Sequence, residues 1–203
     1  GLGSRIRGGF IFMESFYTVE ELGQMGFKHL GTRNVLISRK ASIYGIENVS
    51  IGNNARIDDF CILSGKISIG NYVHIAAYTA LYGGKDGIVI DDFANLSSRV
   101  SVYSVSDDYS GETMTNPMVP EQYKAVVSAP VYIGKHVIIG ATSVVLPGVI
   151  IQEGSAFGCF SLIKNDSEEW SMNIGIPTRK IKERSKELLD YESRLKEERV
   201  IYE

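Results

Sequence analysis

The stretch SVYSVSDDYSG, residues 101–111, places side chains with chemical potential close together. Asp107 and Asp108 are neighbouring carboxylates, and a carboxylate can hydrogen-bond an amine and aim its lone pair at an electrophile. If the attacking group were a hydroxyl instead, it would need a general base to remove its proton. The general base is most often histidine, and this stretch contains no histidine. SDDYSG is also rich in turn-forming residues, so a simple turn is the competing interpretation.

The histidines and cysteines lie elsewhere in the chain. His74, in YVHIAAYTALYGG, precedes an apolar position and should therefore point outward. We expect His29 to be structural and His136 to be an ordinary outward-facing residue. The spacing of the three does not suit a three-histidine zinc site, so we expect no metal. Cys61 and Cys159 are interpreted as small core residues rather than nucleophiles.

The elements that must position these side chains repeat every six residues, a period that neither a helix nor an ordinary strand has. After a slip of three residues at GGKDG and again after a long interruption, the same spacing resumes. The apolar positions are Ile51, Ile57, Leu63, Ile69, Ile75 and Leu81, then Ile90, Leu96 and Val102, then Ile133, Ile139, Val145, Ile151, Phe157 and Ile163. Three hexads close a triangular coil, so the pattern predicts an all-β solenoid, a left-handed parallel β-helix. A β-sandwich would show an alternation of two instead.

Two further regularities describe the corners of these coils. Glycine directly follows several of the apolar residues of the six-residue repeat, which we call ladder residues. We interpret it as a backbone position with an unusual φ. These glycines are Gly52, Gly70, Gly134, Gly140 and Gly158. Small residues come four positions after a ladder residue, where a crowded corner is expected. They are Ala55, Cys61, Thr79, Ser143, Ser155 and Ser161.

The ladder sets the boundaries of the predicted regions. We interpret residues 1–12 as a remnant of an expression vector, 13–40 as an N-terminal helix and lead-in, and 41–180 as the β-helix. Residues 181–203 are predicted to be a C-terminal helix. Residues 103–130 have no ladder and hold three of the five prolines, so they should leave the solenoid as a long loop, and such loops are usually functional.

The two helices are predicted from different sequence patterns. Thr18 and Glu21, in TVEE, fit a capping box for a short helix within residues 16–29. In IKERSKELLDYESRLKEER, residues 181–199, Ile181, Leu188 and Leu195 lie seven apart between charges. This pattern predicts an amphipathic helix that packs on the solenoid or on a neighbouring subunit.

Composition excludes several classes of function. The net charge of −3 and a pI near 5.7 do not favour binding to nucleic-acid phosphates. Two cysteines in 203 residues are no disulfide framework, so a cytoplasmic location is expected. No apolar run reaches the roughly 18–20 residues of a membrane span, so we expect no membrane partner.

The closing segment, VYIGKHVIIGATSVVLPGVIIQEGSAFGCFSLIKNDSEEWSMNIGIPTRKIKER, resembles that of the hexapeptide-repeat acyltransferases, and the resemblance covers residues 40–185. SIYGIENVSIGNNARIDDFCILSGKISIGNYVHIAAYTALYGG and DDFANLSSRVSVYSVSDDYSG are similar to N-acyltransferases that modify nucleotide-linked 4-amino-4,6-dideoxy sugars. Those enzymes serve O-antigen, capsule or spore glycan synthesis. The resemblance implies a homotrimer with active sites between subunits and acetyl-CoA or another acyl-CoA as cosubstrate.

The resemblance also suggests roles for residues. Asp107 would orient the amine, supported by Ser97, with His74 near the thioester. Ala141 and Ser161 would contact the pantetheine arm of CoA. Lys164, Arg179 and Lys180 would lie near its phosphates or adenosine, and Pro177 where the adenine packs. The expected acceptor-binding residues are Asp58, Asp59, Tyr82, Asn95, Arg99, Tyr103 and Asp108.

Three other functions remain as alternatives. An O-acetyltransferase would use His74 as its general base. A zinc enzyme of the carbonic anhydrase type on the same fold would need three histidines around one metal. A non-catalytic solenoid would lack the closing pattern quoted above.

Overall fold

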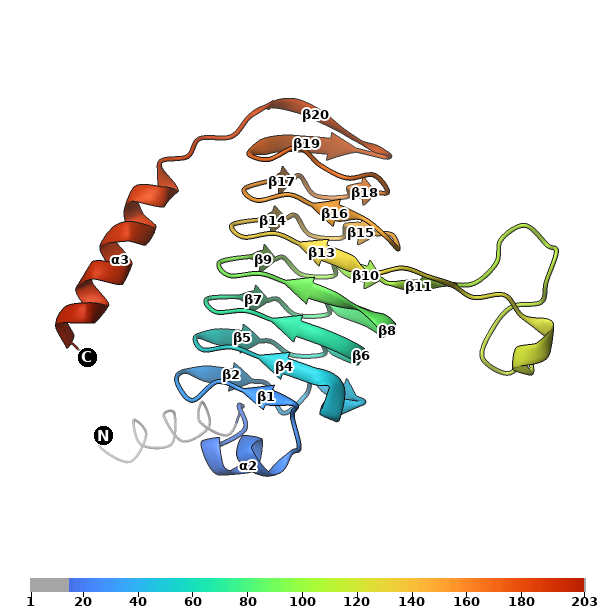
Figure 1. Cartoon of the computed structure of the whole chain (residues 1–203), viewed down its shortest axis with the longest axis horizontal. Helices are drawn as coiled ribbons and strands as arrows, with labels where there is room; N and C mark the ends of the chain where they lie inside the picture. The colour runs from blue at the N-terminus through green and yellow to red at the C-terminus, as the bar shows by residue number, and fades with distance from the viewer. Residues whose placement is uncertain (1–14, 203) are drawn as a thin grey trace, which may run out of the picture.

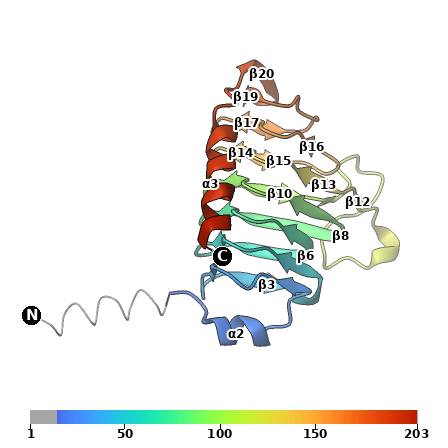
Figure 2. The ribbon, with the colours of Figure 1, turned by 60° about the vertical axis from the view of Figure 1, so that its left-hand side comes forward.

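The structure, a computed structural model, describes residues 15–202, with side chains up to Arg199, and residues 1–12 lie outside it. The chain forms a column of stacked triangular coils, with a long arm leaving one side and a helix lying along another (Figures 1 and 2). This is the predicted left-handed parallel β-helix.

Short parallel strands form the three faces of the column. The first face comprises β3 (Ser42–Tyr44), the first halves of β6 (Ile62–Ile69) and β8 (Ala80–Ile90), β10 (Ser101–Tyr103), β15 (Val144–Val145) and β18 (Leu162–Ile163). The second face comprises β1 (His29–Leu30), β4 (Val49–Ile51), the second halves of β6 and β8, β13 (Val131–Ile133) and β16 (Ile150–Ile151). A short 3-10 helix, η1 (Ile46–Asn48), precedes β4.

The third face comprises β2 (Val35–Ile37), β5 (Ala55–Ile57), β7 (His74–Ile75), β9 (Asn95–Leu96), β14 (Ile138–Ile139), β17 (Ala156–Phe157) and β19 (Ser171–Gly175). The strand β20 (Thr178–Glu183) pairs antiparallel with β19 and ends the sheet. The register on this face aligns the predicted ladder residues of successive coils, namely Ile57, Ile75, Leu96, Ile139 and Phe157.

The core of the solenoid consists of the ladder predicted from the sequence. Every ladder residue is buried, and the most accessible of them, Phe157, is only 4% exposed. The small residues predicted at crowded corners are buried as well, and several of them hydrogen-bond across the corner. Thr79 Oγ1, for example, donates to the carbonyl of Ser97 in the next coil at 2.9 Å.

The glycines that follow ladder residues have a different cause from the one predicted, because none of the five has a positive φ. A Cβ on Gly140 would lie 2.5 Å from the backbone nitrogen of Cys159, so glycine is required there by the close approach of the next coil. The positive φ angles occur two residues after these glycines. At one corner of the triangle they occur on large residues, among them Tyr72, Phe93 and His136.

The lower end of the column is closed by α2 (Val19–Gln24). Its predicted capping box is present, since Thr18 Oγ1 accepts from the Glu21 amide at 3.2 Å and Glu21 Oε2 accepts from the Thr18 amide at 2.8 Å. Leu22 is buried against the first coils. The helix therefore covers apolar surface that the first coils would otherwise expose.

The predicted loop 103–130 leaves the column as an arm (Figure 1). Tyr103 still belongs to β10, and β11 (Val105–Ser106) pairs antiparallel with β12 (Val127–Ser128) to form the stem of the arm. The outer part carries a short 3-10 helix, η2 (Glu121–Tyr123). Ser128 Oγ donates to Asp86 Oδ2 at 2.5 Å and so ties the stem to β8.

The C-terminal segment differs from the prediction. Residues 178–183 form β20, so Ile181 is an exposed strand residue, and the helix α3 begins later and spans Leu188–Tyr202. The apolar residues of α3 do not gather on one face, so the predicted amphipathic stripe is wrong. The helix nevertheless packs on the solenoid, lying along the corner between the second and third faces (Figure 2).

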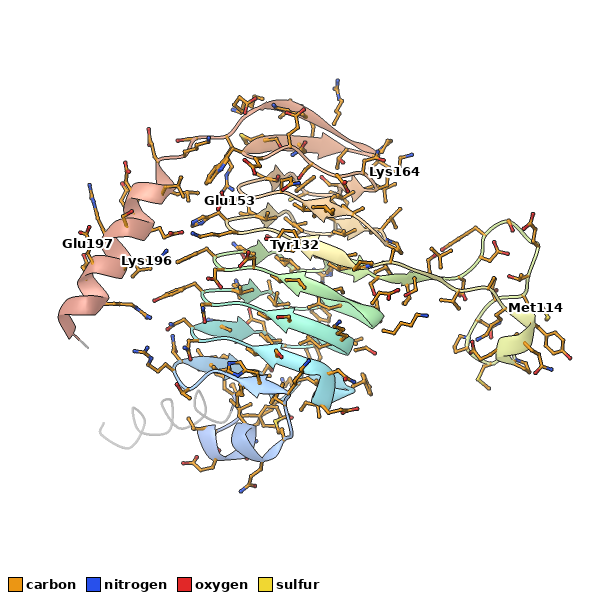
Figure 3. The ribbon with its side chains drawn as sticks, in the orientation of Figure 1. Met114, Tyr132, Glu153, Lys164, Lys196 and Glu197 are labelled. Atoms are coloured by element: carbon orange, nitrogen blue, oxygen red, sulfur yellow. The ribbon has the colours of Figure 1, made fainter. Side chains whose placement is uncertain are left out.

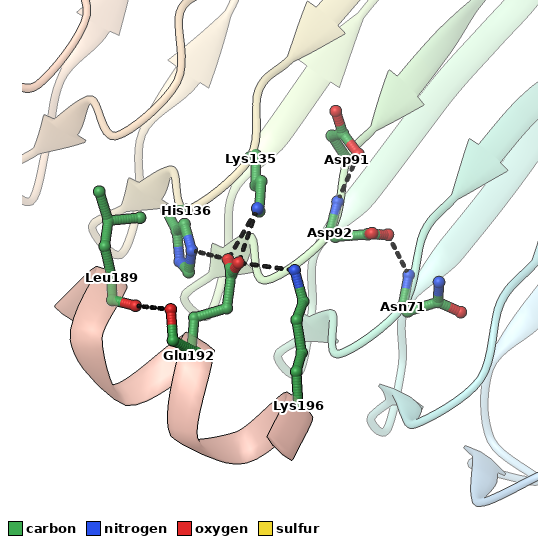
Figure 4. A network of polar contacts seen from close by, with 9 residues as sticks. Asn71, Asp91, Asp92, Lys135, His136, Leu189, Glu192 and Lys196 are labelled. Carbon is green, nitrogen blue, oxygen red and sulfur yellow. Dashed lines mark hydrogen bonds and ion pairs between the residues drawn. The ribbon is translucent and has the colours of Figure 1, made fainter. Parts of the chain in front are cut away.

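Charged contacts around one carboxylate hold α3 in place (Figure 4). Glu192 Oε1 lies 2.5 Å from His136 Nε2 and 2.7 Å from Lys135 Nζ, and Glu192 Oε2 lies 2.7 Å from Lys196 Nζ. His136 is 8% exposed and stacks on Phe93 with ring centroids 4.8 Å apart. The expectation that His136 is an ordinary outward-facing residue is therefore wrong, because α3 covers it.

We expect the ion pairs of Glu192 that hold α3 on the solenoid to break at low pH. Burial raises the pKa of Glu192, but hydrogen bonds from Lys135, Lys196 and His136 outweigh it and bring the pKa to about 2. The stabilisation is therefore complete above the ordinary value of 4.5 and is lost as the pH falls towards 2. Hydrogen exchange of residues 188–199 should rise over that interval.

The variant Glu192→Gln should show fast exchange in α3 already at pH 7, because it leaves Lys135 and His136 without a carboxylate, at a cost of about 2 kcal/mol. Glu197→Gln is the matched control, since Glu197 is an exposed residue of the same helix (Figure 3). Equal exchange in both variants would contradict this account of how α3 is held.

Candidate active site

A cavity of about 1380 Å³ lies where the arm leaves the first face. Strand residues of the first face line one side, and residues of the arm line the other. The lining residues are Ser64, Tyr82, Tyr103, Val105, Ser106, Asp107, Asp108, Tyr109, Pro117, Lys124, Val126, Val127, Val144, Leu146, Pro147 and Lys164. No histidine is among these described residues.

The two adjacent carboxylates in the cavity have different environments. Asp108 Oδ1 accepts from the Ser110 amide at 2.9 Å, and Oδ2 accepts from the amide and the hydroxyl of Thr113 at 3.0 and 2.9 Å. The hydrogen bonds from Ser110 and Thr113 lower the pKa of Asp108 to about 2. Asp107 is exposed, and its carboxylate makes no hydrogen bond or ion pair within the described part of the chain. Asp108 therefore organises the turn, while the Asp107 carboxylate is available to a ligand.

The remaining wall combines aromatic, apolar and cationic groups. Tyr82 and Tyr103, on adjacent coils, stack with ring centroids 5.1 Å apart. Val144 and Leu146 contribute apolar surface from β15 and the turn that follows it. Lys164 lies at the edge of the column, on the side from which the arm leaves (Figure 3). The cavity can thus accommodate a ligand with apolar, cationic and anionic parts.

Lys124 is a lining residue that the sequence analysis did not identify. It directly follows η2 in the arm, and its side chain is only 5% exposed. No periodic pattern in the arm predicts which of its side chains turn towards the solenoid. Its burial became apparent only from the folded arm.

Other predicted residues lie on the third face, outside this cavity. His74 Nε2 lies 2.7 Å from Asp58 Oδ2, and Arg56 Nε donates to Asp58 Oδ1 at 2.6 Å. Burial raises the pKa of Asp58, but the hydrogen bonds from Arg56 and His74 outweigh it, so the net pKa is lowered. Asn95 stands beside His74 in the next coil.

The corner between the third and first faces carries the other candidates. Ser97 is half-buried there, and the guanidinium of Arg99 lies 5.0 Å from the ring centroid of Tyr78. Asp59 accepts a short hydrogen bond from Ser38 Oγ. The structure brings Asp107, Asp108, Tyr82, Tyr103 and Lys164 into one cavity, whereas Asp58, Asp59, His74, Asn95, Ser97 and Arg99 lie outside it.

Ala141 and Ser161, the residues of the last coils predicted to contact CoA, differ in how their main-chain groups are hydrogen-bonded. The carbonyl of Ala141 accepts from the Phe160 amide at 3.0 Å. Both main-chain groups of Ser161 are engaged, the amide with Ser143 Oγ and the carbonyl with the Val144 amide. These bonds leave Ser161 little capacity for a ligand.

The other residues predicted to contact CoA lie near the top of the column and have different surroundings. Pro177 and Arg179 are exposed. Lys180 is paired with Glu168 and Glu183, and its hydrogen bonds to them raise its pKa. Its charge is therefore largely matched, whereas Lys164 has no carboxylate partner within the described residues.

Three remaining expectations concern thiols, metals and membranes. Cys61 is buried as predicted, but Cys159 is exposed, so its assignment to the core is wrong. Residues 15–202 contain no cluster of three or more histidine, cysteine, aspartate or glutamate side chains able to hold a metal ion. Within the same range, no helix has the length and apolar character to cross a membrane.

Comparisons with known proteins agree with this architecture. The family model described as bacterial transferase hexapeptide (six repeats) matches residues 48–83. The dTDP-4-amino-4,6-dideoxy-D-glucose acyltransferase of Escherichia coli is 54% identical over 176 residues, which is 85% of this chain and 91% of the relative.

Solved structures of similar proteins are also acyltransferases. AntD, an N-acyltransferase from Bacillus cereus in complex with dTDP and 3-hydroxybutyryl-CoA, is 53% identical with a TM-score of 0.88, covering 91% of this chain and 97% of AntD. A serine variant of AntD, in complex with dTDP-4-amino-4,6-dideoxyglucose and coenzyme A, has a TM-score of 0.89 and 52% identity, covering 91% and 98%.

The coils, the closing segment and these matches define a hexapeptide-repeat acyltransferase. More particularly, the chain belongs to the family of N-acyltransferases represented by the Escherichia coli and Bacillus cereus enzymes, as the resemblance indicated.

Proposed function

We propose that this enzyme transfers an acyl group, acetyl or longer, from acyl-CoA to the 4-amino group of a dTDP-linked 4-amino-4,6-dideoxy sugar, for surface glycan biosynthesis in the cytoplasm. The observation that carries the proposal is the unengaged carboxylate of Asp107 in a cavity with no histidine among its described lining residues. An amine needs no base to become nucleophilic once it is neutral, so this cavity suits an amine better than a hydroxyl.

The reaction follows from these groups. The amine donates a hydrogen bond to Asp107, which aims the nitrogen lone pair at the thioester carbon. The C–N bond forms as the carbonyl π electrons move to oxygen, and the tetrahedral intermediate then expels the CoA thiolate. The excess proton of the nitrogen passes to the thiolate, directly or through Asp107, because thiols have a pKa of about 8.5.

The variants of the Bacillus cereus relative support the choice of Asp107. They alter a serine and an aspartate ten residues further along that chain. Two pairs here have that spacing, Ser97 with Asp107 and Ser98 with Asp108. Because the Asp108 carboxylate is occupied by its own turn, the first pair is the better candidate.

A homotrimer would bring the two predicted groups of site residues together. Asp107 lies in the arm beyond the first face, whereas Ser97, Asn95 and His74 lie on or beside the third face of the same chain. A second copy beside the arm can present its third face to this cavity. The arm also carries very exposed side chains, Tyr109 and Met118, which such a neighbour would cover.

O-acetylation with His74 as general base is the second candidate. The observation that favours it is the Asp58–His74 contact of 2.7 Å, since a carboxylate that orients a histidine is typical of general-base sites. His74 is, however, outside the cavity of its own protomer.

We expect the acceptor to distinguish these two reactions. In a thiol-release assay with acetyl-CoA and with 3-hydroxybutyryl-CoA, dTDP-4-amino-4,6-dideoxyglucose should be turned over. Its 4-hydroxy analogue should react at least about 100-fold more slowly, because a hydroxyl needs a general base and the described lining of the cavity contains no histidine. Comparable turnover of the hydroxyl sugar, abolished by His74→Gln, would establish the second candidate instead.

A further inference from the structure

Lys124 is a buried cation whose surroundings do not account for its burial. Its side chain is 5% exposed, although lysine is rarely buried without a close partner. Its carboxylate partner is Glu121, three residues earlier, with Nζ and Oε1 2.9 Å apart, and the Glu121 side chain is 86% exposed. An ion pair with so exposed a carboxylate contributes little, and the ammonium has three N–H groups to donate.

The arm holds Lys124 in place through the same network that engages Asp108. Thr113, whose amide and hydroxyl donate to Asp108, also accepts from the Ala125 amide through Oγ1 at 3.2 Å. The Met114 amide donates to the Tyr123 carbonyl at 2.9 Å. Residues 113–114 and 123–125 are thereby held together, so the lysine is preorganised towards the cavity that it lines.

We propose that Lys124 binds a diphosphate, that of the nucleotide-linked sugar, and so fixes the acceptor opposite Asp107. This inference rests on the proposed function. Lysine binds phosphate as a compact positive charge, and a buried one does so with little competition from water. In the acceptor the 4-amino group and the diphosphate are separated by a single pyranose ring, so one cavity must hold both a partner for the amine and a cation for the phosphates.

CoA also contains a diphosphate, which makes it the alternative source of the same chemistry. The acceptor is favoured because Lys124 and Asp107 belong to the same arm and line the same cavity. The predicted cation for the donor, Lys164, lies on the column instead.

Calorimetric titration of the full-length protein tests this assignment, with dTDP, thymidine and CoA as separate probes. Lys124→Met should raise the Kd for dTDP by 10-fold or more and leave the affinities for thymidine and CoA unchanged. Its KM for the nucleotide sugar should rise far more than its kcat falls. Lys124→Arg, which keeps the charge, should remain within about threefold of wild type for dTDP.

Glu121→Gln is the matched control, because it removes the ion-pair partner and leaves the cavity wall intact. It should bind dTDP at least as tightly as wild type. An unchanged dTDP affinity in Lys124→Met overturns the proposal, and so does a selective loss of CoA affinity. Failure of the wild type to bind dTDP would contradict the proposed function itself, which separates the two failures.

Discussion

Asp107→Asn should lower kcat with the amino sugar by about 100-fold or more and change the KM values little. The amide keeps the size of the side chain, but it cannot accept a proton, and its NH2 group would face the amine as a second donor. Loss of a group that orients or relays a proton at the reacting atom typically costs a factor of about 100 to 10,000. Steady-state thiol release with saturating acyl-CoA measures the effect.

Asp108→Asn is the matched control for this variant. The two residues are neighbours, yet Asp108 is bound to Ser110 and Thr113 and holds the turn. Its replacement should raise hydrogen exchange in the arm and raise the KM for the acceptor, with a loss in kcat of about tenfold at most. If Asp107→Asn retained kcat within about threefold of wild type while Asp108→Asn lost it, the assignment of the two carboxylates would be reversed.

Gly154→Ala should strongly destabilise the column at one of its corners. Gly154 has a φ of +73°, and an added Cβ would lie 2.3 Å from Cδ2 of Trp170. The left-handed backbone costs alanine about 1–2 kcal/mol, and displacement of the indole adds about 1–3 kcal/mol. We expect a loss of about 3 kcal/mol and a fall in Tm of roughly 10 °C.

Fluorescence reports the same event, because Trp170 is the single tryptophan of the chain and is buried. Its emission should shift to longer wavelength in Gly154→Ala. Gly111→Ala is the matched control, with a φ of +83° but no atom within 4 Å of the added Cβ. It should cost about 1 kcal/mol and leave the emission unchanged. Equal losses in both variants would mean that backbone strain, rather than the indole contact, dominates at Gly154.

The C-terminal helix shows why a local pattern can mislead. The spacing of Ile181, Leu188 and Leu195 predicted one amphipathic helix, but the segment around Ile181 pairs with β19 as an additional strand. A strand at the end of a sheet satisfies backbone groups that the last coil leaves open, and the segment's own sequence carries no sign of this. The helix that follows is docked by Glu192, whose partners lie far away in the sequence.

His136 and Lys124 illustrate the same limit at single residues. The position of His136 beside the ladder predicted an ordinary outward-facing residue, but α3 returns over it and buries it. Lys124 lies in a segment without periodicity, so nothing local indicates that its side chain turns inward. Cys159, assigned to the core from its place in a coil, is exposed.

What the sequence determined by itself was the solenoid and its core, and it also indicated Asp107 as a candidate for orienting the amine. Each hexad repeats the same local requirement of one inward apolar residue and a small corner residue, so the same pattern recurs along the whole column. The tertiary structure decided which outward side chains meet. The arm and α3 are aperiodic, and their positions depend on contacts such as Ser128 with Asp86 and Glu192 with His136, which join residues more than forty positions apart.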